Sequence, residues 1–176
     1  KYFPKAKKTK IIDWNFVDAC WEKESREYQY VAANYLKAMQ SYLKDSDLPK
    51  LEQLVVTKSW WDTVDILYRI VGSLVYDKPE MEKLILPWSL SDNIWLRRVA
   101  IDHQLLRKAK TNVQLMEKIL QNNMNQTEFF INKSIGWALR DYSKTNPAWV
   151  ETFIEKNKER MADLSIKEAS KYLSHR

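Results

Sequence analysis

Residues 59–75 read SWWDTVDILYRIVGSLV, and this stretch shows a clear periodic pattern. Apolar side chains recur in it every three or four positions, at Trp60, Val64, Leu67, Val71 and Leu74. That spacing is typical of an α-helix that buries one face against its neighbours. We therefore predict a helix over residues 60–75, with the side chain of Trp60 in the core.

Trp61 and Asp65 stand four residues apart on this predicted helix, so they project from the same face. An indole ring beside a carboxylate suits a positively charged target. Each residue also has a plainer interpretation, because a lone tryptophan is more often a core residue and a lone aspartate near a helix start is usually a solvated or capping group. Asp62 points elsewhere round the helix and is interpreted as structural.

The same periodicity extends outward through the chain. It predicts further helices over residues 11–21, 26–43, 81–88, 94–108, 111–122, 127–145, 147–160 and 165–174, and a short one that ends near Val56. Asp13 is a candidate N-cap within the first of these. Because the chain holds only two glycines and five prolines, its composition favours helices over strands. The predicted fold class is all-α.

The helices follow a repeating order, in which a shorter helix precedes a longer one. Trp61, Arg98 and Trp137 lie near the starts of the longer helices, at intervals of about 40 residues, which is close to the period of HEAT-like repeats. Stacked repeats form an α-solenoid, and residues at matching positions line its concave surface. The sequence thus predicts a single curved domain over 1–176, on whose concave face Trp61, Asp65, Arg98 and Trp137 converge.

The charge of the chain points to a polyanionic partner. Lys and Arg number 29 against 23 Asp and Glu, which gives a net charge of +6 and a pI near 9.2. A basic surface attracts nucleic acid through its summed field, although many helical proteins are mildly basic without such a partner. Lys133, Trp137, Arg140 and Lys144 share one predicted helix face, which is either a solvated basic stripe or a set of phosphate contacts.

Several classes of protein are excluded or disfavoured. No run approaches the roughly 18 apolar residues of a membrane span, so no membrane partner is expected and a cytoplasmic location is predicted. The single Cys20 permits neither an intrachain disulfide nor a cysteine metal site, and it is predicted to be buried. Neither histidine has companions at ligand spacing. We expect no metal, no cofactor and a monomer.

Four segments resemble a known family, the DNA alkylation repair glycosylases of the AlkD type, which are built from HEAT-like repeats. The segments are ESREYQYVA (24–32), SWWDTVD (59–65), NIWLRRVAI (93–101) and FFINKSIGWALRDY (129–142). They stand in the family's order, and the resemblance extends over nearly all of the chain. The family also carries further N-terminal helices, which we expect this domain to lack.

The resemblance implies roles for individual residues. Asp65 matches the catalytic aspartate, and Trp61 and Trp137 match the two tryptophans that flank the lesion nucleotide. The active-site arginine best matches Arg98, although Arg97 next to it leaves the register open by one and is a second DNA-binding candidate. The resemblance implies a difference from ordinary glycosylases, which flip the base out of the duplex, because this family makes its contacts to the sugar and backbone. A prokaryotic, nucleoid-associated protein bound to duplex DNA with alkylated bases is implied.

The chemistry of alkylated purines agrees with this set of residues. N3-alkyladenine and N7-alkylguanine are already cationic, so their glycosidic bond can break without a general acid. Positive charge then develops on the deoxyribose, where a carboxylate stabilises it. A charge pair about 4 Å apart at an effective dielectric near 20 is worth roughly 4 kcal/mol, or about a thousandfold in rate. Asp65 is the group for this role.

A DNA glycosylase acting on cationic alkylpurines in duplex DNA is therefore the predicted function. Two alternatives belong to other classes. A non-catalytic DNA-binding paralogue should have lost the aromatic or the carboxylate at Trp61 or Asp65, and both are present. A protein-binding helical scaffold is favoured if the basic residues are scattered round the surface instead of lining one groove.

Overall fold

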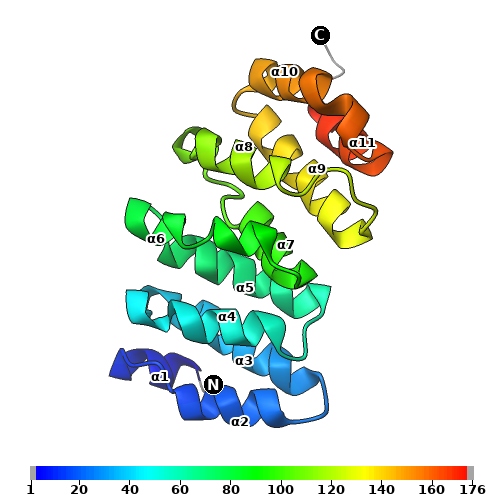
Figure 1. The fold of residues 1–176 in the computed structure, drawn as a ribbon. Coiled ribbons are helices and arrows are strands. Elements are labelled where there is room, and N and C mark those ends of the chain that lie inside the picture. Colours follow the sequence, from blue (N-terminus) through cyan, green and yellow to red (C-terminus); the bar gives the residue numbers. More distant parts are fainter. Residues whose placement is uncertain (1–2, 174–176) are drawn as a thin grey trace. The chain divides into compact units, whose positions relative to one another are not determined.

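The computed structural model describes residues 3–173, and these residues form helices without any β-strand, which confirms the all-α prediction (Figure 1). The α-helices are α1 (Phe3–Thr9), α2 (Trp14–Glu22), α3 (Glu27–Met39), α4 (Leu48–Val56), α5 (Trp61–Leu74), α6 (Pro79–Lys83), α7 (Ile94–Asp102), α8 (Val113–Gln121), α9 (Phe129–Ser143), α10 (Pro147–Asn157) and α11 (Asp163–Ala169). Short 3-10 segments are η1 (Gln40–Tyr42), η2 (Asp45–Asp47), η3 (Pro87–Leu90), η4 (Lys108–Lys110), η5 (Lys158–Arg160) and η6 (Ser170–Tyr172).

The chain divides into two compact units, which comprise residues 1–82 and 83–176. The single domain over 1–176 that the repeat pattern suggests stays a prediction.

The first unit is built from antiparallel neighbours in chain order. α2 packs against α3, and α5 packs against both α3 and α4 (Figure 1). Leu36, Leu51 and Leu67 are fully buried and supply one side chain each from α3, α4 and α5 to this core. Asp13 is the N-cap of α2, as predicted, because its side chain accepts a hydrogen bond from the backbone N–H of Phe16.

The helix predicted over 60–75 is α5, but it begins one residue later than the periodicity indicates. Val64, Leu67 and Val71 are fully buried, as the apolar stripe predicts. Trp60 is the N-cap residue and has an extended backbone, so its side chain leaves the helical face and is 45% exposed. The prediction that Trp60 belongs to the core is therefore wrong.

The second unit is organised round α9, which packs against α7, α10 and α11, while α8 packs against α7 (Figure 1). Ile131, Ile135 and Leu139 face this core from α9 and are almost completely buried. Cys20, in the first unit, is also buried, as the sequence indicates.

Most predicted helix bounds differ from the structure by a few residues, and some differ by more. The helix predicted over 94–108 ends at Asp102, because the side chain of Gln104 turns to hydrogen-bond the backbone of Asn112 instead. The segment predicted as a helix over 81–88 is divided between α6 and η3. The predicted last helix runs to 174, a residue outside the described range, and α1 was not predicted from the periodicity.

Candidate functional site

The predicted pair of Trp61 and Asp65 lies at the start of α5. Trp61 is the first residue of the helix and its side chain is 46% exposed. Asp65 follows one turn later and is half-buried. An exposed ring and a carboxylate therefore lie on one face of the first helical turn, as the four-residue spacing predicts.

Asp62, between them in sequence, faces α3 and accepts hydrogen bonds from two of its side chains. Arg26 donates from Nη2 at 2.6 Å and from Nε at 3.3 Å, and the Tyr30 hydroxyl donates at 2.5 Å. Arg26 also donates to the Lys58 carbonyl and to the Thr63 hydroxyl. This network joins the start of α3 to the start of α5, which supports the structural interpretation of Asp62.

The same contacts set the ionisation of the network. Burial opposes the charged form of Asp62, but hydrogen bonds from Arg26 and Tyr30 outweigh it and lower the pKa of this carboxyl. The pKa of the Tyr30 hydroxyl is raised, because it donates to Asp62. Asp62 is therefore an ionised residue that holds the start of α5 against the start of α3.

Arg98, the predicted active-site arginine, is buried in the second unit. Its side chain is 2% exposed, and Nη1 donates to the Phe130 carbonyl at 2.9 Å and to the Ser134 hydroxyl at 2.7 Å. Asp102, one turn along α7, lies 3.8 Å from its Nε. Such a guanidinium is held by the fold before any ligand arrives.

The guanidinium of Arg98 also lies over the ring of Trp137, 5.2 Å from its centroid. The structure thus brings together two of the residues predicted for the site. The burial of Arg98 favours support of the indole through a cation–π contact over direct contact with a phosphate. Arg97, the second candidate, is half-buried, and its Nε has no hydrogen-bond partner among residues 3–173.

Lys133 and Arg140 flank half-buried Trp137 on α9, and both form ion pairs with Glu168 of α11. The distances are 2.8 Å from Lys133 Nζ to Oε1 and 2.7 Å from Arg140 Nη1 to Oε2. Lys171 adds a third cation and reaches both oxygens at 2.9 Å. Hydrogen bonds from Lys133 and Lys171 lower the pKa of Glu168 to about 2, although burial of the carboxylate opposes this.

Gly136 allows this close approach of α9 and α11. A Cβ atom built on Gly136 would lie 2.5 Å from Glu168 Cβ and 3.1 Å from the Ser165 carbonyl oxygen. Only a residue without a side chain fits between the two helices at this point.

Lys144, the last residue of the predicted basic stripe, follows α9 as its C-cap and is exposed. Its Nζ lies 4.9 Å from the centroid of the Tyr172 ring, a cation–π distance. Trp61 and Asp65 belong to the first unit, whereas the other predicted site residues, Arg97, Arg98, Lys133, Trp137, Arg140 and Lys144, belong to the second.

Sequence reasoning missed Glu168, Lys171 and Arg26. Glu168 and Lys171 stand three residues apart, which indicates a helical pair, but nothing in the sequence joins them to α9. Arg26 lies within a run of charged residues, so the sequence alone does not distinguish it from a solvent-exposed side chain. Their partners are distant in sequence, so only the packing of the helices reveals them.

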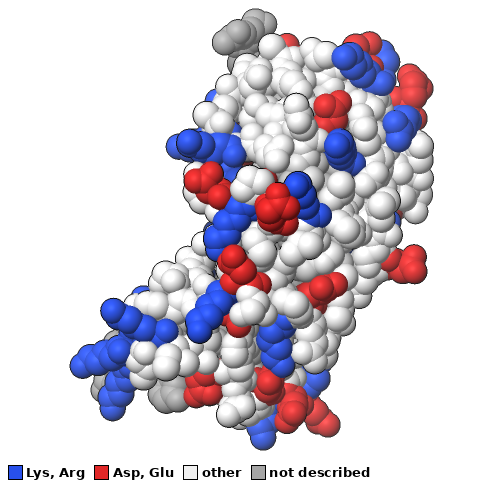
Figure 2. Space-filling model, turned by 60° about the vertical axis from the view of Figure 1, so that its left-hand side comes forward, with Lys and Arg blue, Asp and Glu red and all other residues white. Residues whose placement is uncertain are grey.

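The face drawn in Figure 2 shows Lys and Arg side chains interspersed with Asp and Glu. The net positive charge is therefore not gathered into one uninterrupted area on that face. A basic binding site on this face therefore depends on the contacts of particular side chains and not on the overall charge.

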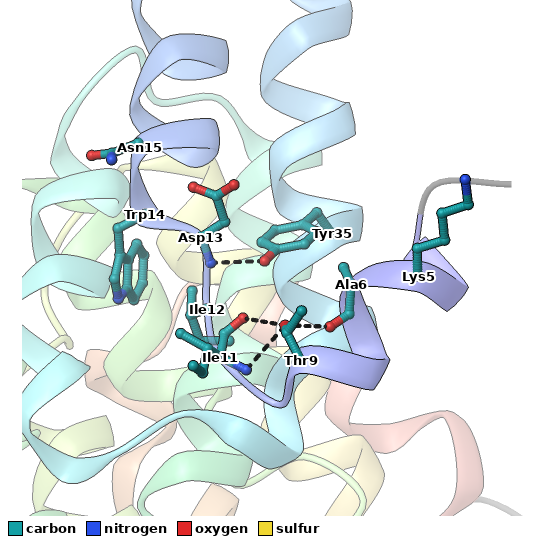
Figure 3. Close-up of a pocket in the computed structure, with 9 residues that line it drawn as sticks. All are labelled: Lys5, Ala6, Thr9, Ile11, Ile12, Asp13, Trp14, Asn15 and Tyr35. Atoms are coloured by element: carbon teal, nitrogen blue, oxygen red, sulfur yellow. Dashed lines mark hydrogen bonds between the residues drawn. The ribbon is translucent and has the colours of Figure 1, made fainter.

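An open cavity of about 660 Å³ lies between α1, α2 and α3, and none of the predicted site residues lines it. Figure 3 shows Trp14, Ile11 and Tyr35 along its wall, with the backbone N–H of Asp13 donating to the Tyr35 hydroxyl at 2.8 Å. Across residues 3–173, no cluster of three or more His, Cys, Asp or Glu could hold a metal ion. No helix in the same range is long and apolar enough to cross a membrane.

Comparisons with known proteins agree with the all-α fold. The solved structure of a predicted DNA alkylation repair enzyme from Enterococcus faecalis is 36% identical, with a TM-score of 0.85, over 92% of this chain and 76% of that chain. AlkD2 from Streptococcus mutans has the same fold, with a TM-score of 0.66 at 19% identity over 98% of each chain. No curated protein matches the sequence.

The family described as DNA alkylation repair enzyme matches residues 1–173, which is almost the whole chain. The relative from Enterococcus faecalis carries the same description at well over 30% identity. The chain therefore belongs to the DNA alkylation repair enzyme family.

Proposed function

We propose that this protein is a DNA glycosylase, which hydrolyses the N-glycosidic bond of cationic alkylated purines in duplex DNA without extruding the base. The observation that carries the proposal is the exposed Trp61 one turn before Asp65 at the start of α5, in a chain of this repair family. A non-catalytic paralogue would have no need to keep both.

The reaction begins as the bond between C1′ and the purine nitrogen lengthens. The departing base takes the bonding electron pair and becomes neutral, because it was cationic at the start. The positive charge passes to the deoxyribose, where the carboxylate of Asp65 stabilises it. Roughly 4 kcal/mol is available from such a pair at an effective dielectric near 20.

Water, oriented by Asp65, then attacks C1′ and forms the C–O bond, and its proton passes to the Asp65 carboxylate and from there to solvent. Trp61 in the first unit and Trp137 in the second each offer an indole, and contact between a cation and an aromatic face is worth about 0.5–2 kcal/mol. Arg98 keeps the Trp137 ring in place, and Lys133, Arg140 and Lys144 contact the DNA backbone.

A second candidate is a protein-binding helical scaffold. The interspersed charges on the face in Figure 2 favour it, since a surface that binds duplex DNA needs an excess of basic side chains. A scaffold has no reason to release a base from DNA, so one assay separates the two candidates.

The test is a single-turnover assay with duplex DNA that contains N7-methylguanine. The proposal requires the protein to release 7-methylguanine much faster than the same DNA loses it by spontaneous depurination. Release at the spontaneous rate, by protein shown to be folded, would overturn the glycosylase assignment.

A further inference from the structure

Glu168 occupies an unusual position for a carboxylate, because three cations converge on it, two from α9 and one from η6, the segment after its own helix. Its side chain is only 7% exposed, whereas Lys133 and Arg140 are each 27% exposed and Lys171 is 46% exposed. The anion is therefore covered by its partners, and the cations form the outer layer. One negative charge against three positive charges leaves a local excess of two positive charges.

The close packing of α9 against α11 fixes the geometry of this cluster. Gly136 lets α11 approach α9 until Glu168 lies against it, and α9 makes its most extensive contacts with α11. Lys133 and Arg140 extend from α9 on either side of Gly136 and meet the two oxygens of the same carboxylate. Long basic side chains, which are normally mobile, are held here at one place on the surface.

The three cations also keep unused hydrogen-bond donors. A lysine ammonium carries three N–H donors and a guanidinium five. Lys133 and Arg140 each give one hydrogen bond to Glu168, and Lys171 gives two. Each of the three cations therefore has donors left after its bonds to Glu168, and an oxyanion with several oxygens can accept from such donors.

We propose that Lys133, Arg140 and Lys171 form a binding site for one phosphodiester group of DNA, with Glu168 as the internal carboxylate that organises the three cations. The inference rests on the proposed function, because it specifies where duplex DNA is held. The proposed phosphate site also lies beside Trp137, which stands between Lys133 and Arg140 on the same face of α9. A phosphate fixed here would anchor the strand next to the indole.

Glu168 matters because it removes conformational freedom before DNA binds. Without the carboxylate, each long side chain would have to be ordered during binding, at a cost in affinity. The opposite expectation follows from net charge alone, since removal of a negative charge should strengthen binding to DNA. The two effects have opposite signs, and a measurement can decide between them.

The experiment compares Lys171→Ala with Lys167→Ala. Both residues are exposed, both belong to the same C-terminal segment and both substitutions remove one positive charge, but only Lys171 contacts Glu168. Affinity for a short fluorescent duplex is measured by anisotropy over a range of salt concentrations. Lys171→Ala should reduce the slope of log affinity against log salt by about one unit, and Lys167→Ala should leave it unchanged.

Glu168→Gln completes the test. The variant carries one more positive charge than the parent, yet loss of organisation should weaken binding by about threefold. Thermal melting of each variant shows that it is folded, and the exposed Lys171 keeps the test valid if Glu168→Gln unfolds.

The outcomes separate this inference from the proposed function. If the parent protein does not bind duplex DNA, the proposed function fails and the site fails with it. If the parent binds, but Lys171→Ala has the same slope as Lys167→Ala, or Glu168→Gln binds more tightly, then the phosphate site is wrong while the proposed function stands.

Discussion

The carboxylate of Asp65 carries the charge on which the proposed reaction depends. Asp65→Asn keeps the shape of the side chain and removes its charge, so the rate of 7-methylguanine release should fall by about a thousandfold. Affinity for the same duplex should change little, because the charge acts on the transition state and not on bound substrate. Single-turnover release and anisotropy measure the two quantities. A folded Asp65→Asn variant with the parental rate would remove Asp65 from the mechanism.

Glu168 links stability to pH. Its pKa in the folded protein is about 2, against an ordinary value of 4.5, because Lys133 and Lys171 hydrogen-bond to the charged form. A lowered folded pKa stabilises the protein above the ordinary value and loses that effect as pH falls towards 2. The difference in melting temperature between the parent and Glu168→Gln should therefore be constant above about pH 6 and shrink between pH 4.5 and 2. A difference that does not vary with pH would contradict this.

Single residues show where sequence reasoning reaches its limit. Lys133, Trp137 and Arg140 do lie on one helix, as their spacing predicts, because a helical face depends only on local geometry. The burial of Arg98 could not be predicted, since its partners Phe130 and Ser134 belong to a helix far along the chain. Charged residues in a sequence are usually exposed, and only tertiary contacts identify the exceptions.

At the scale of helices, the contact between α9 and α11 depends on Gly136. Helix propensity alone predicts that Gly136→Ala would stabilise the protein by up to about 1 kcal/mol. The added Cβ would instead lie 2.5 Å from Glu168 Cβ, so the helices must separate. We expect a net loss of about 1–3 kcal/mol in the free energy of unfolding, measured by urea denaturation. A variant as stable as the parent would show that α11 can move aside without cost.

The hydrogen-bond network that joins the start of α3 to the start of α5 gives a second prediction at the scale of helices. Arg26→Ala removes the hydrogen bonds to Asp62, Lys58 and Thr63 and leaves the half-buried carboxylate of Asp62 without its cation. We expect a loss of about 1–2 kcal/mol in the free energy of unfolding, discounted because the pair is partly exposed.

Lys50→Ala is the matched control for Arg26→Ala. It breaks one ion pair of similar length, with Asp18, and one 3.2 Å hydrogen bond to Gln53 on the same helix, which is fewer bonds than Arg26 makes. Its cost should stay below about 1 kcal/mol. Equal losses in the two variants would show that the Arg26 network contributes no more than an isolated surface pair.

Most of the helices were predictable because periodicity and caps are local. Asp13 marks the start of α2 and the stripe along 60–75 marks α5. The early end of α7 at Asp102 was not predictable, because it depends on Gln104 bonding to Asn112 and on the Leu106 N–H bonding to Asp141. Whether the helix continues past Asp102 depends on these contacts with residues of neighbouring segments, which are distant in sequence.

For the whole molecule, the all-α fold could be predicted from periodicity and composition, and family membership from four segments and their order, whereas the cation cluster at Glu168 could not. The repeat period places residues by position in a unit, so it detects Trp61, Arg98 and Trp137. It does not detect a residue such as Glu168, whose role arises from close packing of two particular helices.

The proposed reaction selects its substrate by the charge of the leaving base. This selectivity is a property of the protein as a whole. A cationic purine leaves as a neutral base, whereas a neutral base such as uracil leaves as an anion and needs a general acid or a hydrogen-bond donor beside it; general acid catalysis contributes about 10²–10⁴-fold in rate. The protein should therefore release 7-methylguanine but leave uracil in an otherwise identical duplex at the spontaneous rate. Parallel single-turnover assays measure both, with Asp65→Asn as the control for contaminating glycosylase. Excision of uracil at a comparable rate would mean that a general acid acts at this site, and the mechanism based on Asp65 alone would have to be abandoned.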